Sequence, residues 1–456
     1  MALSPLGTPT ARRIRRVSPA QSLLLGFTAL VIVGIVPLRL PIASRDGTVQ
    51  PFVDALFTAT SAVTTTGLIV VDTGSYYSPF GQMVILALFQ VGGLGYMAFI
   101  AFVALAMRRR LSLSAGLTLQ ESMAGVTASQ IREFITSVFA YTLLFEGLGT
   151  VALAGSWMRD FPVERALYLG LFHSVSAFCT AGFSLFPDSF MAYRGDVPIN
   201  VTVAVVSCGG AVGFFVLRDL THYLPLLWAG KRPRRLTLHT KLALSIWLPL
   251  VVVGSAIFLL AEARSLAGEA LRERLAAATF QAVSACTTTG FNSVDIGKMT
   301  GTSLFWLVIV MFVGSAPGGT GGGIKSTTLG VVVATVVALL RGRQDTVAFG
   351  RRLPEDTVRR ALTIGLLATV VVILVTLLLT ATERQPFLSI LFEVASALGT
   401  VGLSAGITPS LSTFGKIVIS ITMLVGRLGP LAIGFALLAR PKAVPFRYAE
   451  EKVFLG

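Results

Sequence analysis

The feature that most constrains this chain is a series of apolar runs, each long enough to cross a lipid bilayer. A transmembrane helix needs about 20 predominantly apolar residues. Eight runs reach this length, at roughly 22–40, 81–106, 134–156, 198–217, 241–261, 303–340, 361–381 and 416–439. Shorter apolar stretches separate the two members of each successive pair, near 52–66, 166–181, 274–289 and 387–401. We therefore expect an all-α membrane protein with eight transmembrane helices and four re-entrant segments.

The charge of the chain indicates its orientation in a membrane rather than a nucleic-acid partner. The net charge is +15, yet 54% of the residues are hydrophobic and only 13% are charged. A soluble nucleic-acid-binding protein does not carry so much apolar sequence. Lys and Arg concentrate in the N-terminus, the C-terminal tail and loops 107–133, 218–241 and 341–360, which eight spans place on one side. The positive-inside rule then predicts a cytoplasmic-membrane protein with both termini in the cytoplasm.

Each short apolar stretch follows one pattern, F-x-x-x-S-A-x-x-T-x-G-[LF]. The copies begin at Phe57, Phe172, Phe280 and Phe392, and the glycine stands ten positions after the phenylalanine in all four. Two spans per copy is an even number, so all four copies share one orientation, unlike the inverted repeats of many transporters. We therefore predict four parallel repeats, each a span, a re-entrant pore loop and a span, in a pseudo-fourfold arrangement around one pore.

The repeats also set the predicted domain organisation. A cytoplasmic N-terminal segment covers 1–19, and a cytoplasmic C-terminal tail covers 440–456. The pore repeats between them cover 20–110, 111–230, 231–343 and 344–439. A gating loop at 314–328 interrupts the third repeat.

The chemistry of the motif favours a site for cations. Non-helical backbone inside a membrane is tolerated only where it is buried in protein or lines water. Glycine allows the positive φ that turns successive carbonyls toward an axis, and four such segments make a carbonyl cage of the K⁺-filter type. The candidate filter residues, which would act mainly through backbone carbonyls, are Thr65, Thr66, Gly67, Leu68, Thr180, Ala181, Gly182, Phe183, Thr288, Thr289, Gly290, Phe291, Thr400, Val401, Gly402 and Leu403.

The sixth span contains a helix-breaking sequence, GSAPGGTGGGIKSTT, at Gly314–Thr328. Pro and repeated Gly cannot sustain a helix, so this span is predicted to break within the membrane. It is not a P-loop, because Ile324 separates the last glycine from Lys325 and the flanks are membrane spans. Either a gating loop or a simple kink fits the sequence. The candidate gate residues are Gly314, Pro317, Gly318, Gly319, Gly321, Gly322, Gly323, Lys325 and Arg427.

Two further charges fall within the predicted spans. Arg427 lies in the eighth span, where a buried cation is costly and by default functional. Its alternative role is structural, as a partner for Glu146 or for carbonyls of the loop. We interpret Glu146 itself as an intramembrane hydrogen-bonding residue rather than an ion site.

No catalytic constellation accompanies these motifs. The cysteines, Cys179, Cys208 and Cys286, form no CxxC pair, and the three histidines do not cluster in the sequence. We therefore expect no enzyme activity and no cofactor. A membrane enzyme that uses the glycine-rich loop is the weaker alternative, because it would lack an acid/base pair.

With these residues in place, the chain resembles the Trk/Ktr/HKT superfamily of potassium transporters over nearly its whole length, and is most similar to the Ktr membrane subunit. The resemblance implies potassium uptake, often stimulated by Na⁺, through a pseudo-tetrameric pore in each subunit of a homodimer. It also implies that the loop in the third repeat gates the pore below the filter, facing the arginine of the eighth span. A cytosolic nucleotide-binding regulatory ring of the KtrA/TrkA type, which takes ATP or ADP, is the expected partner.

Two points about selectivity and partners remain open in the sequence. Only the fourth copy has Thr-Val-Gly, at Thr400–Gly402, so conduction of K⁺ is more secure than its discrimination from Na⁺. The runner-up function is an ion-coupled Na⁺/K⁺ symporter with alternating access. The excess positive charge is expected to hold anionic lipid, or an acidic surface of the regulator, at the cytoplasmic face.

Overall fold

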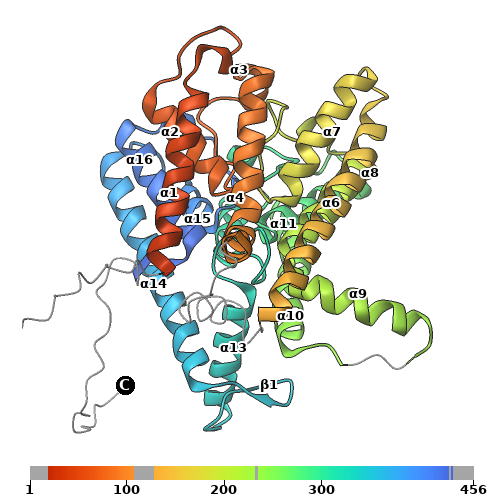
Figure 1. Ribbon diagram of the computed structural model, residues 1–456. Helices are drawn as coiled ribbons and strands as arrows, with labels where there is room; N and C mark the ends of the chain where they lie inside the picture. The colour runs from red at the N-terminus through yellow and green to blue at the C-terminus, as the bar shows by residue number, and fades with distance from the viewer. Residues whose placement is uncertain (1–18, 107–127, 232–234, 431–432, 435–456) are drawn as a thin grey trace, which may run out of the picture.

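The computed structural model describes residues 19–106, 128–231, 235–430 and 433–434. The predicted N-terminal segment, apart from Pro19, and the predicted C-terminal tail lie outside these ranges. The described chain is mostly helical (Figure 1). Its regular sheet is one antiparallel hairpin of β1 (Val347–Ala348) and β2 (Arg351–Arg352), in which Val347 pairs with Arg352.

The helices repeat one order four times: a long first helix, a short helix that carries the motif, an extended segment and a further helix. The further helix of each set, which is α4, α8, α12 or α16, is called its second helix. The first set is α1 (Pro19–Leu38), α2 (Phe52–Val63), the short α3 (Thr73–Tyr76) and α4 (Pro79–Ala106). The second set is α6 (Ala128–Trp157), α7 (Val163–Phe178), α8 (Val197–Ala211) and α9 (Phe214–Trp228). The third set is α10 (Leu238–Ala261), α11 (Leu271–Cys286), α12 (Gly301–Phe312) and α13 (Ser326–Leu340). The fourth set is α14 (Glu355–Thr382), α15 (Phe387–Gly399) and α16 (Thr413–Leu428).

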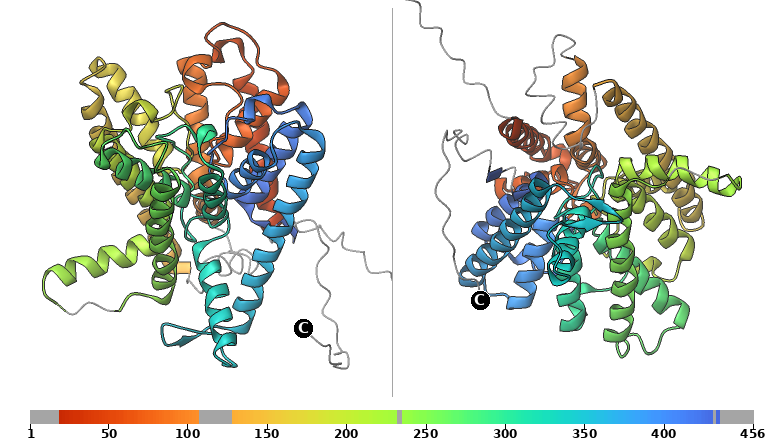
Figure 2. Two further views of the ribbon diagram at one scale, coloured as in Figure 1. Left: turned by 180° about the vertical axis from the view of Figure 1, so that it is seen from behind. Right: turned by 90° about the horizontal axis from the view of Figure 1, so that it is seen from below.

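The four sets follow one another around a common centre in chain order, as the view from below shows (Figure 2). Each set packs on the next: α4 contacts α7, α8 contacts α11, and α12 contacts α15. Helix α16 then packs on α2, so the last set meets the first and the ring of sets closes.

The first helix of each set is long and apolar enough to cross a membrane: Gln21–Leu38, Thr136–Trp157, Leu238–Ala261 and Glu355–Thr382. Large apolar side chains on these helices remain exposed, among them Leu143, Val151 and Leu260, each at least 70% exposed. Such faces suit contact with lipid rather than water. Among the second helices, α4 has 28 residues, but α8, α12 and α16 have only 12–16 each. The count of eight spans therefore stays a prediction.

Two second helices break sharply. Helix α12 ends at Phe312 and α13 begins at Ser326, so the interruption expected in the third repeat is present. The span predicted at 198–217 instead ends at Ala211, and the chain turns by 109° into α9. Gly213 at the turn has a φ of +89°, which glycine adopts without strain. The segment predicted as a loop after 217 therefore begins as a helix.

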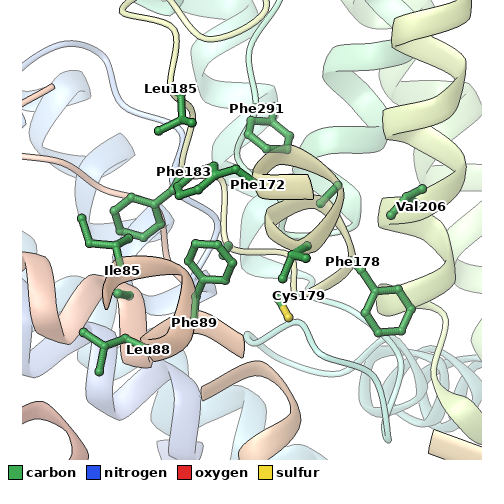
Figure 3. Close-up of a cluster of buried hydrophobic side chains, with 14 of the residues drawn as sticks. Ile85, Leu88, Phe89, Phe172, Phe178, Cys179, Phe183, Leu185, Val206 and Phe291 are labelled. Atoms are coloured by element: carbon green, nitrogen blue, oxygen red, sulfur yellow. The ribbon is translucent and has the colours of Figure 1, made fainter. Parts of the chain in front are cut away.

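The phenylalanine that opens each motif copy is an anchor in the buried core. Phe57, Phe172 and Phe392 are fully buried and Phe280 is nearly so. Figure 3 shows the cluster around the second copy. There Phe89 of α4 packs edge-on against Phe172 at 5.6 Å between ring centroids and stacks on Phe183 at 6.0 Å. The core thus holds the extended segment of the second set against the first set.

Candidate functional site

All four motif copies end their short helix in the same way. The motif alanine carbonyl accepts a hydrogen bond from the motif threonine N–H, at 3.0–3.2 Å in each copy. That threonine then takes the left-handed conformation, with φ of 52°, 51°, 57° and 49° at Thr65, Thr180, Thr288 and Thr400. A β-branched residue rarely adopts this conformation, which costs about 1–3 kcal/mol. Its presence in every copy shows that the turn is a fixed part of the motif.

The motif serine fastens the extended segment that follows. Its backbone carbonyl accepts from the residue before the glycine, at 2.8–2.9 Å in each copy. In the first and fourth copies its hydroxyl accepts from the glycine N–H: Ser61 from Gly67 at 3.1 Å, and Ser396 from Gly402 at 3.0 Å. In the other two copies the serine hydroxyl donates to the carbonyl after the glycine. These hydrogen bonds explain why the pattern has a serine six positions before the glycine.

The four motif glycines come together in one closed ring, the glycine ring, made of Gly67, Gly182, Gly290 and Gly402. A Cβ added at each of them would lie 3.0–3.4 Å from the Cα of the glycine in the next set, taken in chain order and back to the first. The same Cβ would overlap the carbonyl oxygen just before that next glycine. These oxygens belong to Ala181, Thr289, Val401 and Thr66. A side chain has no room at any of the four positions.

The ring thereby gathers four main-chain carbonyl oxygens, one at each contact between neighbouring sets. Within the described residues, no hydrogen bond from the chain reaches these four oxygens. Buried carbonyls without donors are rare, because each loses the hydrogen bonds that it makes to water. A dehydrated cation is a suitable partner for a group of them. The four oxygens of this ring are therefore candidate ligands for a cation.

The segment between α12 and α13, residues 313–325, is called the α12–α13 loop. It lies against motif threonines, which stand two positions before the glycines of the ring. The Thr180 hydroxyl donates to the Thr320 hydroxyl at 3.4 Å, and Thr320 in turn donates to the Phe178 carbonyl at 2.8 Å. A Cβ added at Gly321 would overlap the Thr288 hydroxyl, and one at Gly322 would overlap the Thr400 hydroxyl. Three consecutive loop residues thus each face the threonine of a different set.

Two cations hold the α12–α13 loop in this position. Arg427 donates to the Thr320 carbonyl, and to the carbonyls of Gly92 and Gly93 at 2.8 and 3.2 Å. Lys325 donates to the Gly321 carbonyl at 2.6 Å. Of the two structural partners considered for Arg427, these contacts match the loop carbonyls.

The other predicted gate residues shape the same loop. The Gly314 N–H bonds the Ile324 carbonyl at 2.7 Å, so the two ends of the loop are adjacent. A Cβ at Gly213 would contact the Pro317 carbonyl at 2.6 Å, and the Gly318 carbonyl accepts from Phe214. A Cβ at Gly319 would meet the carbonyls of residues 210 and 211. Gly318 and Gly323 have φ of +80° and +70°.

Glycines in the second helices allow close packing rather than only bending. A Cβ at Gly92, Gly210 or Gly426 would overlap a carbonyl oxygen at the end of the short helix of its own set. These oxygens belong to equivalent positions, Val63, Phe178 and Leu398. The sequence shows these glycines but not the close contact that each of them allows.

Glu146 forms a separate buried cluster. Its carboxylate accepts two hydrogen bonds from the Gln90 amide, at 2.9 and 3.1 Å. The Cys179 thiol donates to the Gln90 side-chain oxygen at 2.9 Å. These contacts agree with the hydrogen-bonding role expected for Glu146.

One buried polar position is absent from the motif because its residue type differs in every copy. The residue after the motif phenylalanine is polar and buried in all four: Thr58, His173, Gln281 and Glu393. In the fourth set the Glu393 carboxylate accepts from Ser404 at 3.1 Å and from Thr408, both just beyond the glycine. In the second set His173 lies 3.1 Å from Ser184, the residue equivalent to Ser404. The sequence signal for this position is a polar residue directly after the phenylalanine in every copy of an otherwise apolar stretch.

The chain is similar to known transport proteins over nearly its full length. A family profile described as TrkH, cation transport protein, matches residues 13–445. The Ktr system potassium uptake protein B of Bacillus subtilis is 37% identical, over 97% of each chain. The potassium/sodium uptake protein NtpJ of Enterococcus hirae is 35% identical, over 98% of this chain and 99% of its own.

A solved structure has the same fold. The crystal structure of the potassium transporter TrkH from Vibrio parahaemolyticus matches with a TM-score of 0.72 at 21% identity. The match covers 94% of this chain and 86% of that one. The likeness extends to the fold as a whole rather than to a single repeat.

Proposed function

Because the chain belongs to the TrkH family of cation transport proteins, we propose that it takes up K⁺ across the cytoplasmic membrane through the centre of its four sets. The observation that carries this proposal is the glycine ring, whose four carbonyl oxygens accept no hydrogen bond from the part of the chain that the structure describes. Na⁺ is a candidate stimulator, since one relative is named a potassium/sodium uptake protein. The protein acts as a transporter and not as an enzyme.

The proposed topology has eight spans with both termini in the cytoplasm. The first helices of the four sets supply four of these spans, and the second helices, of which α8 and α12 are interrupted and α16 is short, supply the others. The short helices α2, α7, α11 and α15 then enter the membrane part-way and return as the extended segments. The positive-inside distribution of Lys and Arg sets the orientation.

In the proposed filter, the backbone carbonyls of the motif replace water around K⁺. The left-handed threonine and the positive-φ glycine alternate along each segment, which aims successive carbonyls to the same side. Each extended segment is fastened by its serine, so the oxygen positions are held by the protein rather than by the ion. Permeation is then channel-like. A fixed Na⁺:K⁺ transport stoichiometry, measured from reversal potentials in proteoliposomes, would instead support the symporter.

The α12–α13 loop is the proposed gate. It lies against three of the four motif threonines and would block the path of an ion that leaves the glycine ring on that side. Arg427 and Lys325 hold two consecutive loop carbonyls, and their charges oppose a passing cation. Opening requires these hydrogen bonds to break and the loop to move aside.

The proposed assembly is a homodimer controlled by a separate cytosolic ring. The Bacillus subtilis relative is named protein B of a Ktr system, which points to a system of more than one component. We propose a nucleotide-binding regulatory subunit that binds the cytoplasmic loops and shifts the gate. Each subunit of the dimer contains a complete ring.

The function is tested by ⁸⁶Rb⁺ uptake into proteoliposomes that contain the purified chain. We expect uptake driven by an inside-negative potential, competed by K⁺ more strongly than by Na⁺. Vesicles that lack the protein are the control for leak. No uptake above that leak, with the protein folded and inserted, would contradict the proposed function.

Arg427→Ala is expected to raise the rate of ⁸⁶Rb⁺ uptake. The variant loses three hydrogen bonds from a charged donor, and each is worth about 1.5–3 kcal/mol. Because 1.4 kcal/mol is a tenfold change in an equilibrium, the open population rises about tenfold or more. Arg427→Lys keeps the charge without the branched donor and should fall between the two. Loss of the folded protein instead of a rise in flux would favour a structural role for Arg427.

Glu393→Ala is expected to weaken the preference for K⁺ over Na⁺. The hydroxyls of Ser404 and Thr408 lose their acceptor, at a cost of about 1–3 kcal/mol to the outer part of the fourth segment. Glu393→Gln keeps a side-chain oxygen in the same place and should stay near the parent protein. The measurement is Na⁺ competition of ⁸⁶Rb⁺ uptake. If Na⁺ inhibits uptake by the alanine variant as it inhibits uptake by the parent, Glu393 has no role in ion selection.

A further inference from the structure

Helix α9 leaves the body of the protein sideways. Its 109° bend from α8 directs it away from the bundle, as Figure 1 shows at the lower right. If α8 crosses the membrane steeply, α9 runs close to the plane of the bilayer surface. The hydrogen bond from the Phe214 N–H to the Gly318 carbonyl, at 3.1 Å, fixes this direction at its start.

The first half of α9 is anchored to the protein. Val216 is fully buried against Ala243 of α10 and Ala316 of the α12–α13 loop. The Asp219 carboxylate accepts from the hydroxyls of Thr237 and Thr240 at the start of α10, both at 2.5 Å. The root of α9 therefore touches both the next set and the proposed gate.

The second half of α9 is apolar and exposed. Leu224, Leu226, Leu227 and Trp228 are 37%, 40%, 49% and 83% exposed. Full burial of one such side chain is worth about 1.5–3 kcal/mol, so this group is costly in contact with water. Exposed tryptophan and leucine on a helix parallel to the bilayer are typical of membrane-surface helices.

A basic group follows this apolar turn directly. Lys231 and Arg235 are exposed, and the sequence between 221 and 240 contains no Asp or Glu. Basic residues beside an apolar helix bind anionic headgroups, each contributing about 1 kcal/mol near the surface. This charge favours an anionic lipid surface over a second copy of the chain, which would bring the same positive charge.

We propose that Leu224–Trp228 inserts among the lipid headgroups and that Lys231 and Arg235 bind the phosphates of anionic lipids. Through the root of α9, this binding stabilises the α12–α13 loop in its position against the ring. Anionic lipid then lowers ion flux. The effects on the loop and on ion flux rest on the proposed function, whereas lipid binding by α9 does not.

Lipid contact is tested with the full chain in vesicles of neutral lipid, with and without phosphatidylglycerol. Trp228 fluorescence is isolated as the difference between the parent protein and Trp228→Phe. We expect quenching by lipids brominated near the headgroup and protection from aqueous iodide. Quenching by iodide would overturn the proposal, and so would protection from both quenchers, which would indicate a covering protein surface.

The charge requirement is tested by Lys231→Gln combined with Arg235→Gln. We expect the apparent affinity for phosphatidylglycerol, read from lipid quenching of Trp228, to fall about fivefold for each residue removed. Lys298→Gln is the matched control, since Lys298 is 85% exposed but pairs with Asp295 on another loop. Equal affinity in the double variant and the parent would overturn the role of these residues.

The link to the gate is tested by ⁸⁶Rb⁺ flux in the same vesicles. We expect lower parent flux with phosphatidylglycerol than without it, and recovery of flux in the double variant. Equal parent flux in both vesicle types, with normal quenching, would overturn the link. Absence of flux in every vesicle type would count against the proposed function and leave the quenching result intact.

Discussion

Removal of Gly318–Gly323 is expected to raise K⁺ flux without changing ion preference. The deletion takes away the loop residues that face the motif threonines, together with the carbonyls that Arg427 and Lys325 hold. Several hydrogen bonds of about 1 kcal/mol each are lost, so we expect a rise of roughly ten- to a hundredfold. The preference should persist, because the glycine ring and its serines lie outside the deleted segment.

The position of the loop's ends favours closure of the shortened loop. The Gly314 N–H bonds the Ile324 carbonyl, so the chain enters and leaves the loop at adjacent residues. The control shortens the exposed turn around Gly342, where an added Cβ meets nothing within 4 Å. Initial ⁸⁶Rb⁺ uptake and its Na⁺ competition are the measurements. Equal uptake before and after the deletion would refute a gate at this loop.

Gly67→Ser is expected to admit more Na⁺. A Cβ at Gly67 would overlap the Ala181 carbonyl and lie 3.1 Å from the Cα of Gly182. Its φ of +87° adds about 1–3 kcal/mol of backbone strain for a residue with a side chain. Neighbouring segments must move apart, and a shift worth about 1.4 kcal/mol lowers the preference for K⁺ tenfold.

A matched control separates ring geometry from backbone strain. Gly350 of the β1–β2 hairpin also has a left-handed φ, +76°, but an added Cβ there meets nothing within 4 Å. Gly350→Ser therefore carries similar strain without the contact and should leave selectivity unchanged. Reversal potentials under K⁺ and Na⁺ gradients give the measurement. Unchanged selectivity in a folded Gly67→Ser protein would count against a filter at this glycine.

The sequence predicts the local part of the site well, because a motif repeated four times fixes local backbone geometry. The glycines of the ring and the break in the third repeat follow from residue types with physical reasons. The serines are visible as motif positions, but their role comes from the structure. The family and the mostly helical membrane fold are confirmed by the comparisons. The roles in ion selection and gating stay predictions.

Contacts between distant parts of the chain could not be predicted from the motif. The left-handed threonines follow from how the extended segment must leave its helix, which no composition rule reveals for a β-branched residue. The close approach at Gly210 depends on the position of α7, and the bend at Gly213 depends on the loop of another set. Glu393 was missed because only the polar and buried character of its position repeats in the four copies, while the residue type does not.

The union of four repeats in one chain has a consequence for how such a protein changes over generations. In an assembly of four identical subunits, every mutation acts on all four quarters at once. Here one substitution alters a single quarter and leaves three intact. The α12–α13 loop belongs to the third set, the Glu393 contacts to the fourth and the bent helix α9 to the second. Four repeats in one chain thus allow each quarter to differ while the shared motif keeps the four central segments alike.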